Sequence, residues 1–107
     1  MNERKHLRFP VQFNSYFASP TADEGLGVVA DMSAEGCLIT SEARVQPGTA
    51  LRVRISLPEI NLHVQVAKAE IRWAKDGQFG LEFKELSDQD KRNLQLAVME
   101  FEKTRET

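Results

Sequence analysis

The stretch Leu51-Arg52-Val53-Arg54-Ile55-Ser56-Leu57 decides the fold class. Apolar side chains occupy every second position, and two arginines and a serine stand between them. Because successive side chains of a strand point to opposite faces of a sheet, this alternation predicts a strand over residues 49–57 with one buried face and one basic, solvated face. The same period of two recurs over most of the chain, so the sequence predicts a mainly β protein.

Further segments alternate in the same way, and turn-forming residues separate them. The other predicted strands cover residues 9–17, 26–32, 37–40, 60–73 and 79–83. Loops or turns are expected at residues 18–25, at Gln46-Pro47-Gly48 and at Asp76-Gly77, where Gly, Pro, Asp and Ser supply the backbone conformations that turns need.

Two of these strands carry finer predictions about burial. In residues 26–32 one face would hold Val28, Ala30 and Met32, and the other would hold Val29, Asp31 and Ser33. In residues 60–73 the apolar side chains change parity, from Ile60, Leu62, Val64 and Val66 to Ala69, Ile71 and Trp73. A bulge or a change of sheet face near Ala67-Lys68 would account for this switch.

The C-terminal segment changes from strand to helix period. Ser87 followed by Asp90 is a capping-box-like start, and a stripe at helical spacing follows, made of Leu94, Ala97, Val98 and Phe101. We therefore expect a helix over about 87–104 that packs on the sheet. Several short strands followed by one terminal helix predict a mainly antiparallel small barrel with the helix against it.

Composition narrows the class of protein. With 107 residues and 41% hydrophobic content the chain is one domain, and a formal net charge of −2 argues against a surface fitted throughout to polyanions. One cysteine makes no intramolecular disulfide and no signal-peptide pattern opens the chain, so a cytoplasmic setting is expected. No apolar run reaches the length of a bilayer-spanning helix, so membrane insertion is not expected.

The chain offers few groups for catalysis. His6, Cys37 and His63 are scattered singly, without the spacing of metal ligands and without a neighbour that would make one of them a base or nucleophile. Glycine patterns of phosphate loops and dinucleotide sites are missing. The sequence therefore predicts a binding protein without catalytic residues, metal or cofactor, rather than an enzyme.

Two polar motifs favour binding of an anion. Arg4-Lys5-His6-Leu7-Arg8 places two arginines four residues apart, and each guanidinium can take two acceptors of a phosphate or the O6/N7 edge of guanine. Asp31 can accept hydrogen bonds from the N–H groups of guanine, and Ser33 can donate or accept beside it. Gly36 would supply a positive φ at the turn that follows.

At these positions the sequence resembles the PilZ domain family, whose signatures are Arg-x-x-x-Arg near the start and Asp/Asn-x-Ser-x-x-Gly about one strand later. Trp73 followed by Gly80-Leu81-Glu82-Phe83 and a helix is similar to that family's last strands. The resemblance implies a six-stranded antiparallel β-barrel that binds cyclic di-GMP. Residues 1–8 would form a flexible ligand-binding segment, and residues 9–107 the barrel domain with its C-terminal α-helix.

By the same resemblance, Arg4 and Arg8 would grip phosphate and guanine, Lys5 is a possible additional contact, and Asp31, Ser33 and Gly36 would receive the guanine base. Family members often couple such binding to motility or exopolysaccharide synthesis through a downstream protein. The chain carries no attached output domain, which favours a stand-alone receiver.

Two alternatives stay open. One is a protein-interaction adaptor that uses the same barrel without nucleotide. The other is a small nucleic-acid-binding barrel using Arg52 and Arg54, although DNA or RNA binding is not expected because aromatic side chains for base stacking are scarce there. The oligomeric state is expected to be a monomer or a weak dimer through Leu96 and Met99, which flank the helix stripe.

Overall fold

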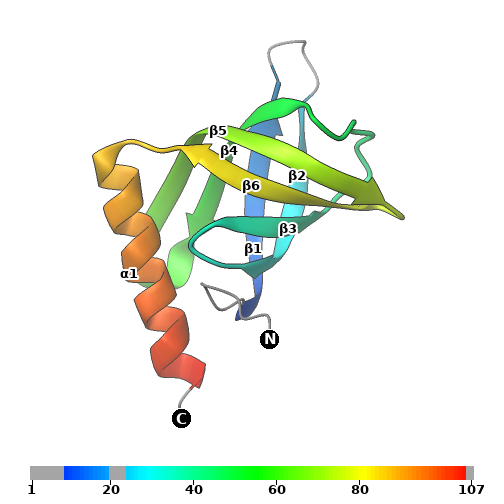
Figure 1. The fold of residues 1–107 in the computed structure, drawn as a ribbon. Coiled ribbons are helices and arrows are strands. Elements are labelled where there is room, and N and C mark those ends of the chain that lie inside the picture. Colours follow the sequence, from blue (N-terminus) through cyan, green and yellow to red (C-terminus); the bar gives the residue numbers. More distant parts are fainter. Residues whose placement is uncertain (1–8, 20–23, 106–107) are drawn as a thin grey trace, which may run out of the picture.

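A computed structural model describes residues 9–19 and 24–105 of the chain (Figure 1). The strands are β1 (Phe9–Ala18), β2 (Glu24–Met32), β3 (Gly36–Thr40), β4 (Ala50–Leu57), β5 (Leu62–Lys75) and β6 (Gln78–Glu85). A short 3-10 turn, η1 (Pro58–Ile60), separates β4 from β5, and one helix, α1 (Asp88–Arg105), ends the described chain. The helix predicted over about 87–104 is confirmed.

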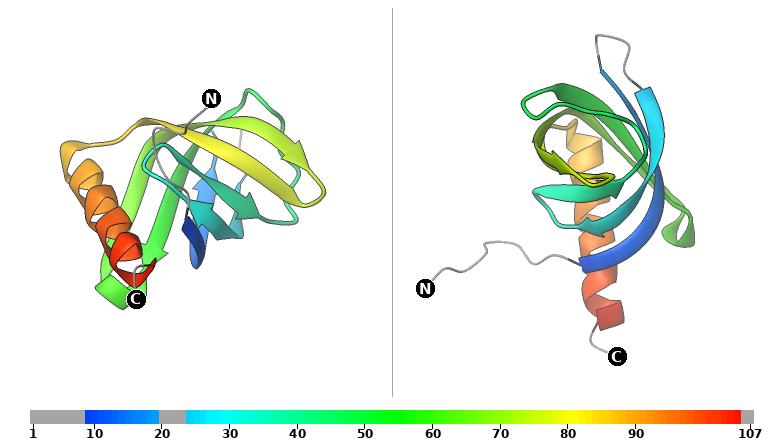
Figure 2. Two further views of the ribbon diagram at one scale, coloured as in Figure 1. Left: turned by 60° about the horizontal axis from the view of Figure 1, so that its bottom comes forward. Right: turned by 90° about the vertical axis from the view of Figure 1, so that its right-hand side faces the viewer.

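The strands form a closed barrel in the order β1-β2-β3-β6-β5-β4, and every neighbouring pair is antiparallel. Pairing of β1 with β4 closes the barrel, with Tyr16 opposite Arg54 and Phe17 opposite Val53. Figure 2 shows the barrel from two further sides, with α1 beside it. Both the small antiparallel barrel and the six strands implied by the family resemblance are confirmed.

The predicted alternation of β4 is confirmed residue by residue. Leu51, Val53, Ile55 and Leu57 are buried in the barrel, whereas Arg52 and Arg54 are exposed. Inside the barrel the rings of Phe17 and Phe79 meet edge to face with their centroids 5.2 Å apart, an arrangement that aromatic pairs prefer. The core therefore lies between the six strands.

Single-residue register shifts decide which side chains face the core. The shift predicted near Ala67-Lys68 is confirmed, because β4 and β5 lose register between Leu51 and Val53 and both residues of the predicted pair are exposed. An extra residue, Ala30, also interrupts the pairing of β2 with β3. As a result Val29 and Met32 are both buried, and the strict two-face assignment predicted for residues 26–32 is wrong.

Helix α1 covers an edge of β5 that β6 does not reach. The pairing of β5 with β6 begins at Lys68, so the earlier residues of β5 lack a strand on that side. The backbone N–H of Gln65 donates instead to the Asp90 carboxylate at 2.9 Å, and the Asn93 side-chain amide donates to the His63 carbonyl at 3.0 Å. Two side chains of the helix thus replace the missing strand for these backbone groups.

The apolar side of α1 packs on the barrel as its spacing predicted. Leu94 and Ala97 are buried, and the ring of Phe101 lies 5.7 Å from the rings of both Phe9 and Phe13. The capping-box-like start is confirmed as well, because the Ser87 hydroxyl accepts the Asp90 N–H at 3.0 Å and donates to its carboxylate at 2.7 Å. Asp90 therefore serves both the helix start and the edge of β5.

We expect Asp90→Ala to lower the free energy of unfolding by about 1–2 kcal/mol, because it removes the acceptor of the Gln65 N–H together with part of the cap. Urea unfolding followed by circular dichroism measures the loss. Asp88→Ala is the matched control: it removes the same charge at the same helix end, where no described residue bonds to the Asp88 side chain. It should cost less than about 1 kcal/mol, and equal losses would contradict the double role of Asp90.

Candidate functional site

The motif from Asp31 to Gly36 forms the hairpin turn between β2 and β3. The Ser33 N–H donates to the Gly36 carbonyl at 2.9 Å, and the Ser33 hydroxyl accepts the Glu35 N–H at 3.1 Å. Ser33 is only 3% exposed. Its hydroxyl therefore shapes the turn, as serine commonly does through local backbone bonds, while Asp31 is half-buried at the end of β2.

Gly36 is needed for a different reason from the one its sequence suggested. Its φ is not positive, since the positive-φ glycines of the described chain are Gly48 and Gly77. A Cβ on Gly36 would lie 2.1 Å from the backbone oxygen of Leu81 on β6. The predicted turn conformation is thus wrong, and the absence of a side chain instead lets β3 approach β6 closely.

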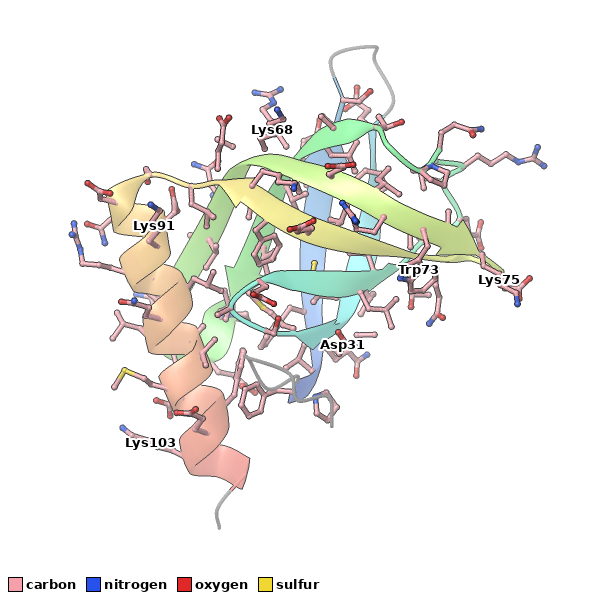
Figure 3. The ribbon with its side chains drawn as sticks, viewed as in Figure 1. Asp31, Lys68, Trp73, Lys75, Lys91 and Lys103 are labelled. Atoms are coloured by element: carbon pink, nitrogen blue, oxygen red, sulfur yellow. The ribbon has the colours of Figure 1, made fainter. Side chains whose placement is uncertain are left out.

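Asp31 belongs to a row of residues that crosses the outer face of the barrel. Pro10 pairs with Asp31, Asp31 with Leu38, Leu38 with Gly80, and Gly80 with Trp73. Paired residues of a sheet share a face. Figure 3 shows Asp31 and Trp73 at two places along this side, with β3 and β6 between them.

The neighbouring row points inward and is completely buried. It contains Phe9, Met32, Cys37, Leu81 and Ile71. The outer row therefore rests on a rigid, packed layer, which holds Asp31 at a fixed place relative to Trp73.

Trp73 lies over Gly80, a contact that the alternation of residues 60–73 does not predict. The sequence placed Trp73 on the buried side, but an extra residue, Arg72, shifts the register between Ile71 and Trp73, and the indole is 45% exposed. A Cβ on Gly80 would lie 2.4 Å from the indole nitrogen. A two-residue turn at Asp76-Gly77 pairs Trp73 with Gly80, three residues from the turn on each strand. The turn sequence therefore predicts this pairing.

A hollow of about 230 Å³ lies beside this contact. Its lining consists of Glu35, Gly36, Arg72, Trp73, Gly80, Leu81 and Glu82. Four charges beside it pair with one another: Arg72 lies 3.2 Å from Glu82 and 3.7 Å from Glu70, and Lys84 lies 3.3 Å and 3.7 Å from the same two carboxylates. This lattice of two cations and two anions has no net charge.

The cations for an anionic ligand must therefore come from elsewhere in the chain. Arg4, Lys5 and Arg8, which the sequence proposed for this role, lie outside the described residues. The next residue after Arg8 is Phe9, which opens β1 opposite Met32, and Pro10 stands opposite Asp31. The chain thus enters the barrel beside Asp31.

Side chains that could hold a metal ion do not gather in the described part of the chain. Across residues 9–19 and 24–105, no three His, Cys, Asp or Glu side chains gather as a metal ion would require. Cys37, considered above as a nucleophile, is buried in the inner row. In the same ranges no helix has the length and apolar character needed to cross a membrane.

A family model described as the PilZ domain matches residues 2–100. The chain belongs to the PilZ domain family. The match includes the Arg-x-x-x-Arg signature of residues 4–8 and the turn built by Asp31, Ser33 and Gly36. None of the curated proteins matches the sequence.

Solved structures show the same fold at low identity. The PilZ domain of YcgR from Escherichia coli, solved with c-di-GMP, has a TM-score of 0.76 at 13% identity over 97% of this chain and 95% of its own. The PilZ domain of CeSA from a cellulose synthesizing bacterium has a TM-score of 0.72 at 19% identity, covering 90% of this chain and 98% of that domain.

The inhibitor of motility MotI/DgrA from Bacillus subtilis has a TM-score of 0.80 at 20% identity, over 100% of this chain and 55% of its own. The chain therefore spans about half the length of that protein.

Gly36→Ala should lower the free energy of unfolding by about 2–3 kcal/mol, because β3 and β6 must separate to admit the methyl group. Gly48→Ala is the comparison, since a Cβ there meets nothing within 4 Å and only its φ of 88° is unfavourable; we expect a loss of about 1 kcal/mol. Urea unfolding measures both. A Gly36 variant no less stable than the Gly48 variant would contradict the close approach.

Gly80→Ala should push the indole of Trp73 away from β6 and expose it further. Trp73 is the only tryptophan of the 107 residues, so we expect its emission to shift to longer wavelength and acrylamide to quench it more. Ala67→Ser is the control. It changes an exposed position on β5, the strand of Trp73, and should leave the emission spectrum unchanged. An unshifted emission maximum in the Gly80 variant would rule out the contact.

Proposed function

We propose that this PilZ domain is a receptor for cyclic di-GMP that acts on a protein partner. The observation that carries the proposal is the outer row of the barrel, where Asp31 stands at the point at which the chain following Arg8 enters the fold. Membership of the PilZ family, and similarity of fold to the YcgR domain solved with c-di-GMP, support the choice of ligand.

The chemistry of the ligand fits these side chains. The Asp31 carboxylate would accept hydrogen bonds from the N1–H and N2–H groups of guanine, while Arg4 and Arg8 would hold phosphate and the O6/N7 edge, and Lys5 would add a further cation. Ser33 and Gly36 would act by shaping the turn that presents Asp31 and by letting β3 approach β6. The exposed indole of Trp73 offers a flat surface at the other end of the row.

The paired lattice of Glu70, Arg72, Glu82 and Lys84 explains why the proposal needs the N-terminal arginines. A neutral surface gives a dianionic ligand little attraction, so residues 1–8 would have to supply the positive charge. Ordering that segment on the ligand would cost about 1–2 kcal/mol per residue of backbone, which the charge-assisted hydrogen bonds would offset at about 1.5–3 kcal/mol each. Binding would thereby change the surface that a partner contacts.

Isothermal titration calorimetry with cyclic di-GMP tests the proposal. We expect saturable binding by the unaltered chain, and Arg8→Ala and Asp31→Ala should each weaken it by at least about tenfold, the effect of losing one charged hydrogen bond. Arg54→Ala is the matched control for Arg8→Ala, because it removes the same side chain from an exposed strand position away from the outer row. It should bind like the unaltered chain.

If calorimetry detects no heat of binding at high micromolar nucleotide, the receptor function is contradicted. Normal binding by Arg8→Ala, with circular dichroism showing an intact fold, would remove the role of that arginine while leaving the receptor function standing. Emission of Trp73 during the same titration gives an independent signal from the far end of the outer row.

A further inference from the structure

A second exposed surface crosses β2, β1, β4 and β5. Leu26 pairs with Tyr16, Tyr16 with Arg54, and Arg54 with Gln65; Arg52 stands beside this row, opposite Ala18. We call these five residues, Leu26, Tyr16, Arg52, Arg54 and Gln65, the Tyr16 face. All five are exposed on the outside of the barrel.

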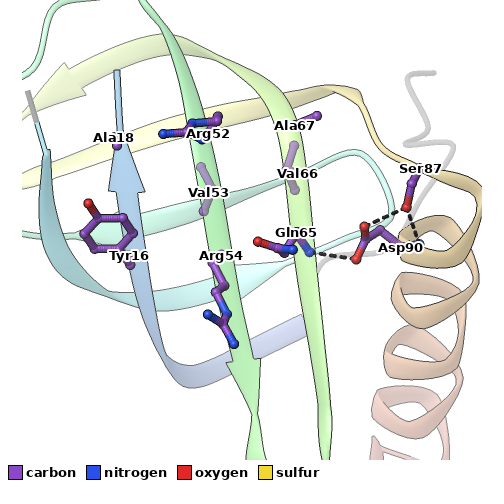
Figure 4. A pocket seen from close by; sticks show the side chains of 10 residues that line it. All are labelled: Tyr16, Ala18, Arg52, Val53, Arg54, Gln65, Val66, Ala67, Ser87 and Asp90. Carbon is purple, nitrogen blue, oxygen red and sulfur yellow. Dashed lines mark hydrogen bonds between the residues drawn. The ribbon is translucent and has the colours of Figure 1, made fainter. Parts of the chain in front are cut away.

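The Tyr16 face is hollowed. A groove of about 420 Å³ lies between β1, β4, β5 and the start of α1, with Tyr16, Arg52, Arg54 and Gln65 among its lining residues and Asp90 at its end. Figure 4 shows the side chains of Tyr16 and Arg54 on neighbouring strands and Asp90 bonded across to the backbone of Gln65. The groove therefore reaches from Tyr16 on β1 to Asp90 at the start of α1.

Apolar surface adjoins the groove. Leu26 is 75% exposed and its strand neighbour Tyr16 is 43% exposed. Together the two side chains form an exposed apolar patch that a partner would cover favourably. Tyrosine and arginine are also the residue types that supply most of the binding energy in protein interfaces.

The two arginines, Arg52 and Arg54, form no ion pair within the described part of the chain. Arg72 and Lys84 on the opposite side, by contrast, are each held between two carboxylates. Because the two arginines occupy alternate positions of one strand, their guanidinium groups leave the barrel on the same side. Both guanidinium groups therefore face the side from which another molecule would approach.

Carboxylates that border the groove disfavour a nucleic acid as that molecule. The Tyr16 hydroxyl hydrogen-bonds to the Glu24 carboxylate at 2.5 Å, and this bond raises the pKa of Tyr16 above its usual 10.0 while holding the ring in place. A phosphate backbone along the groove would run between Glu24 and Asp90. A peptide can instead alternate carboxylates with apolar side chains and avoid both.

We propose that the Tyr16 face docks an acidic segment of a partner protein, with an apolar side chain of that segment against Leu26 and Tyr16 and its carboxylates against Arg52 and Arg54. This proposal deepens the receptor function above by naming the kind of partner, and it rests on that function in requiring an output protein.

The docking surface and the outer row lie toward opposite ends of the same two strands. On β1 and β2 the pair Pro10 and Asp31 marks one end, and the pair Tyr16 and Leu26 the other. Tyr16 lies six residue steps along the strand from Pro10, or about 20 Å at the usual rise per residue. The nucleotide and the acidic segment would therefore bind without competing for the same side chains, while another part of the partner would contact the surface that residues 1–8 change.

Peptide display on the immobilised full chain tests the proposal, without nucleotide and with saturating cyclic di-GMP. We expect enriched peptides to be acidic and to contain Leu, Phe or another large apolar residue. Synthetic copies should bind the double variant Arg52→Glu/Arg54→Glu and the variant Leu26→Ser about tenfold more weakly in fluorescence anisotropy. Lys75→Glu/Lys103→Glu is the matched control, since it reverses two exposed charges elsewhere and should bind normally.

Several outcomes would overturn the proposal: no enrichment, neutral or basic consensus peptides, or equal binding by the Arg52→Glu/Arg54→Glu variant. Two further outcomes would also overturn it and assign the face differently. One is binding of single-stranded RNA that the Arg52→Glu/Arg54→Glu variant loses, and the other is a doubled mass in ultracentrifugation that the same variant loses. Calorimetry of the same variants with cyclic di-GMP separates the two proposals. If the chain binds nucleotide but no peptide, only the docking proposal is contradicted. If it binds peptide but no nucleotide, only the receptor function is contradicted.

Discussion

The arrangement of this domain depends on one requirement: the backbone N–H and C=O groups of β5 that β6 does not reach need hydrogen-bond partners. Asp90 and Asn93 satisfy them from α1, which fixes the start of the helix against the strand. The rest of the helix then follows, and Phe101 arrives between Phe9 and Phe13 at the first residues of β1. A hydrogen-bonding requirement at one edge of the barrel is thereby transmitted to the place where the chain enters it beside Asp31.

Register shifts determine what the barrel presents outside. Without the extra residue at Ala30, Val29 and Met32 could not both be buried; without the one at Arg72, Trp73 would follow Ile71 into the core. Each shift interrupts a ladder locally, and each turns the next side chain to the other face. The outer row of Asp31, Leu38, Gly80 and Trp73 exists because one such shift lies at each end of it, on β2 and on β5.

Much of this fold followed from local patterns in the chain, because alternation in β4, the capping pair Ser87 and Asp90, and the Asp76-Gly77 turn act over a few residues. The burial of Val29 and the exposure of Trp73 did not, since a bulge is decided by packing against strands distant in sequence. Gly36 was recognised as essential for the wrong reason, because the Leu81 oxygen it accommodates lies on another strand. The sequence motif predicts the positions Asp31, Ser33 and Gly36 of the candidate site. It does not predict the exposed indole of Trp73 at the other end of the outer row.

The charge lattice beside Trp73 also bears on how fast a ligand is captured. Alternating charges cancel one another beyond a few ångströms, and salt at cellular concentration screens what remains within about 8 Å. That side of the barrel therefore exerts no long-range pull on a diffusing nucleotide. If the cations of residues 1–8 capture the ligand, this side of the barrel adds little to the ionic-strength dependence of the association rate, and it contributes to the lifetime of the complex rather than to the frequency of encounters.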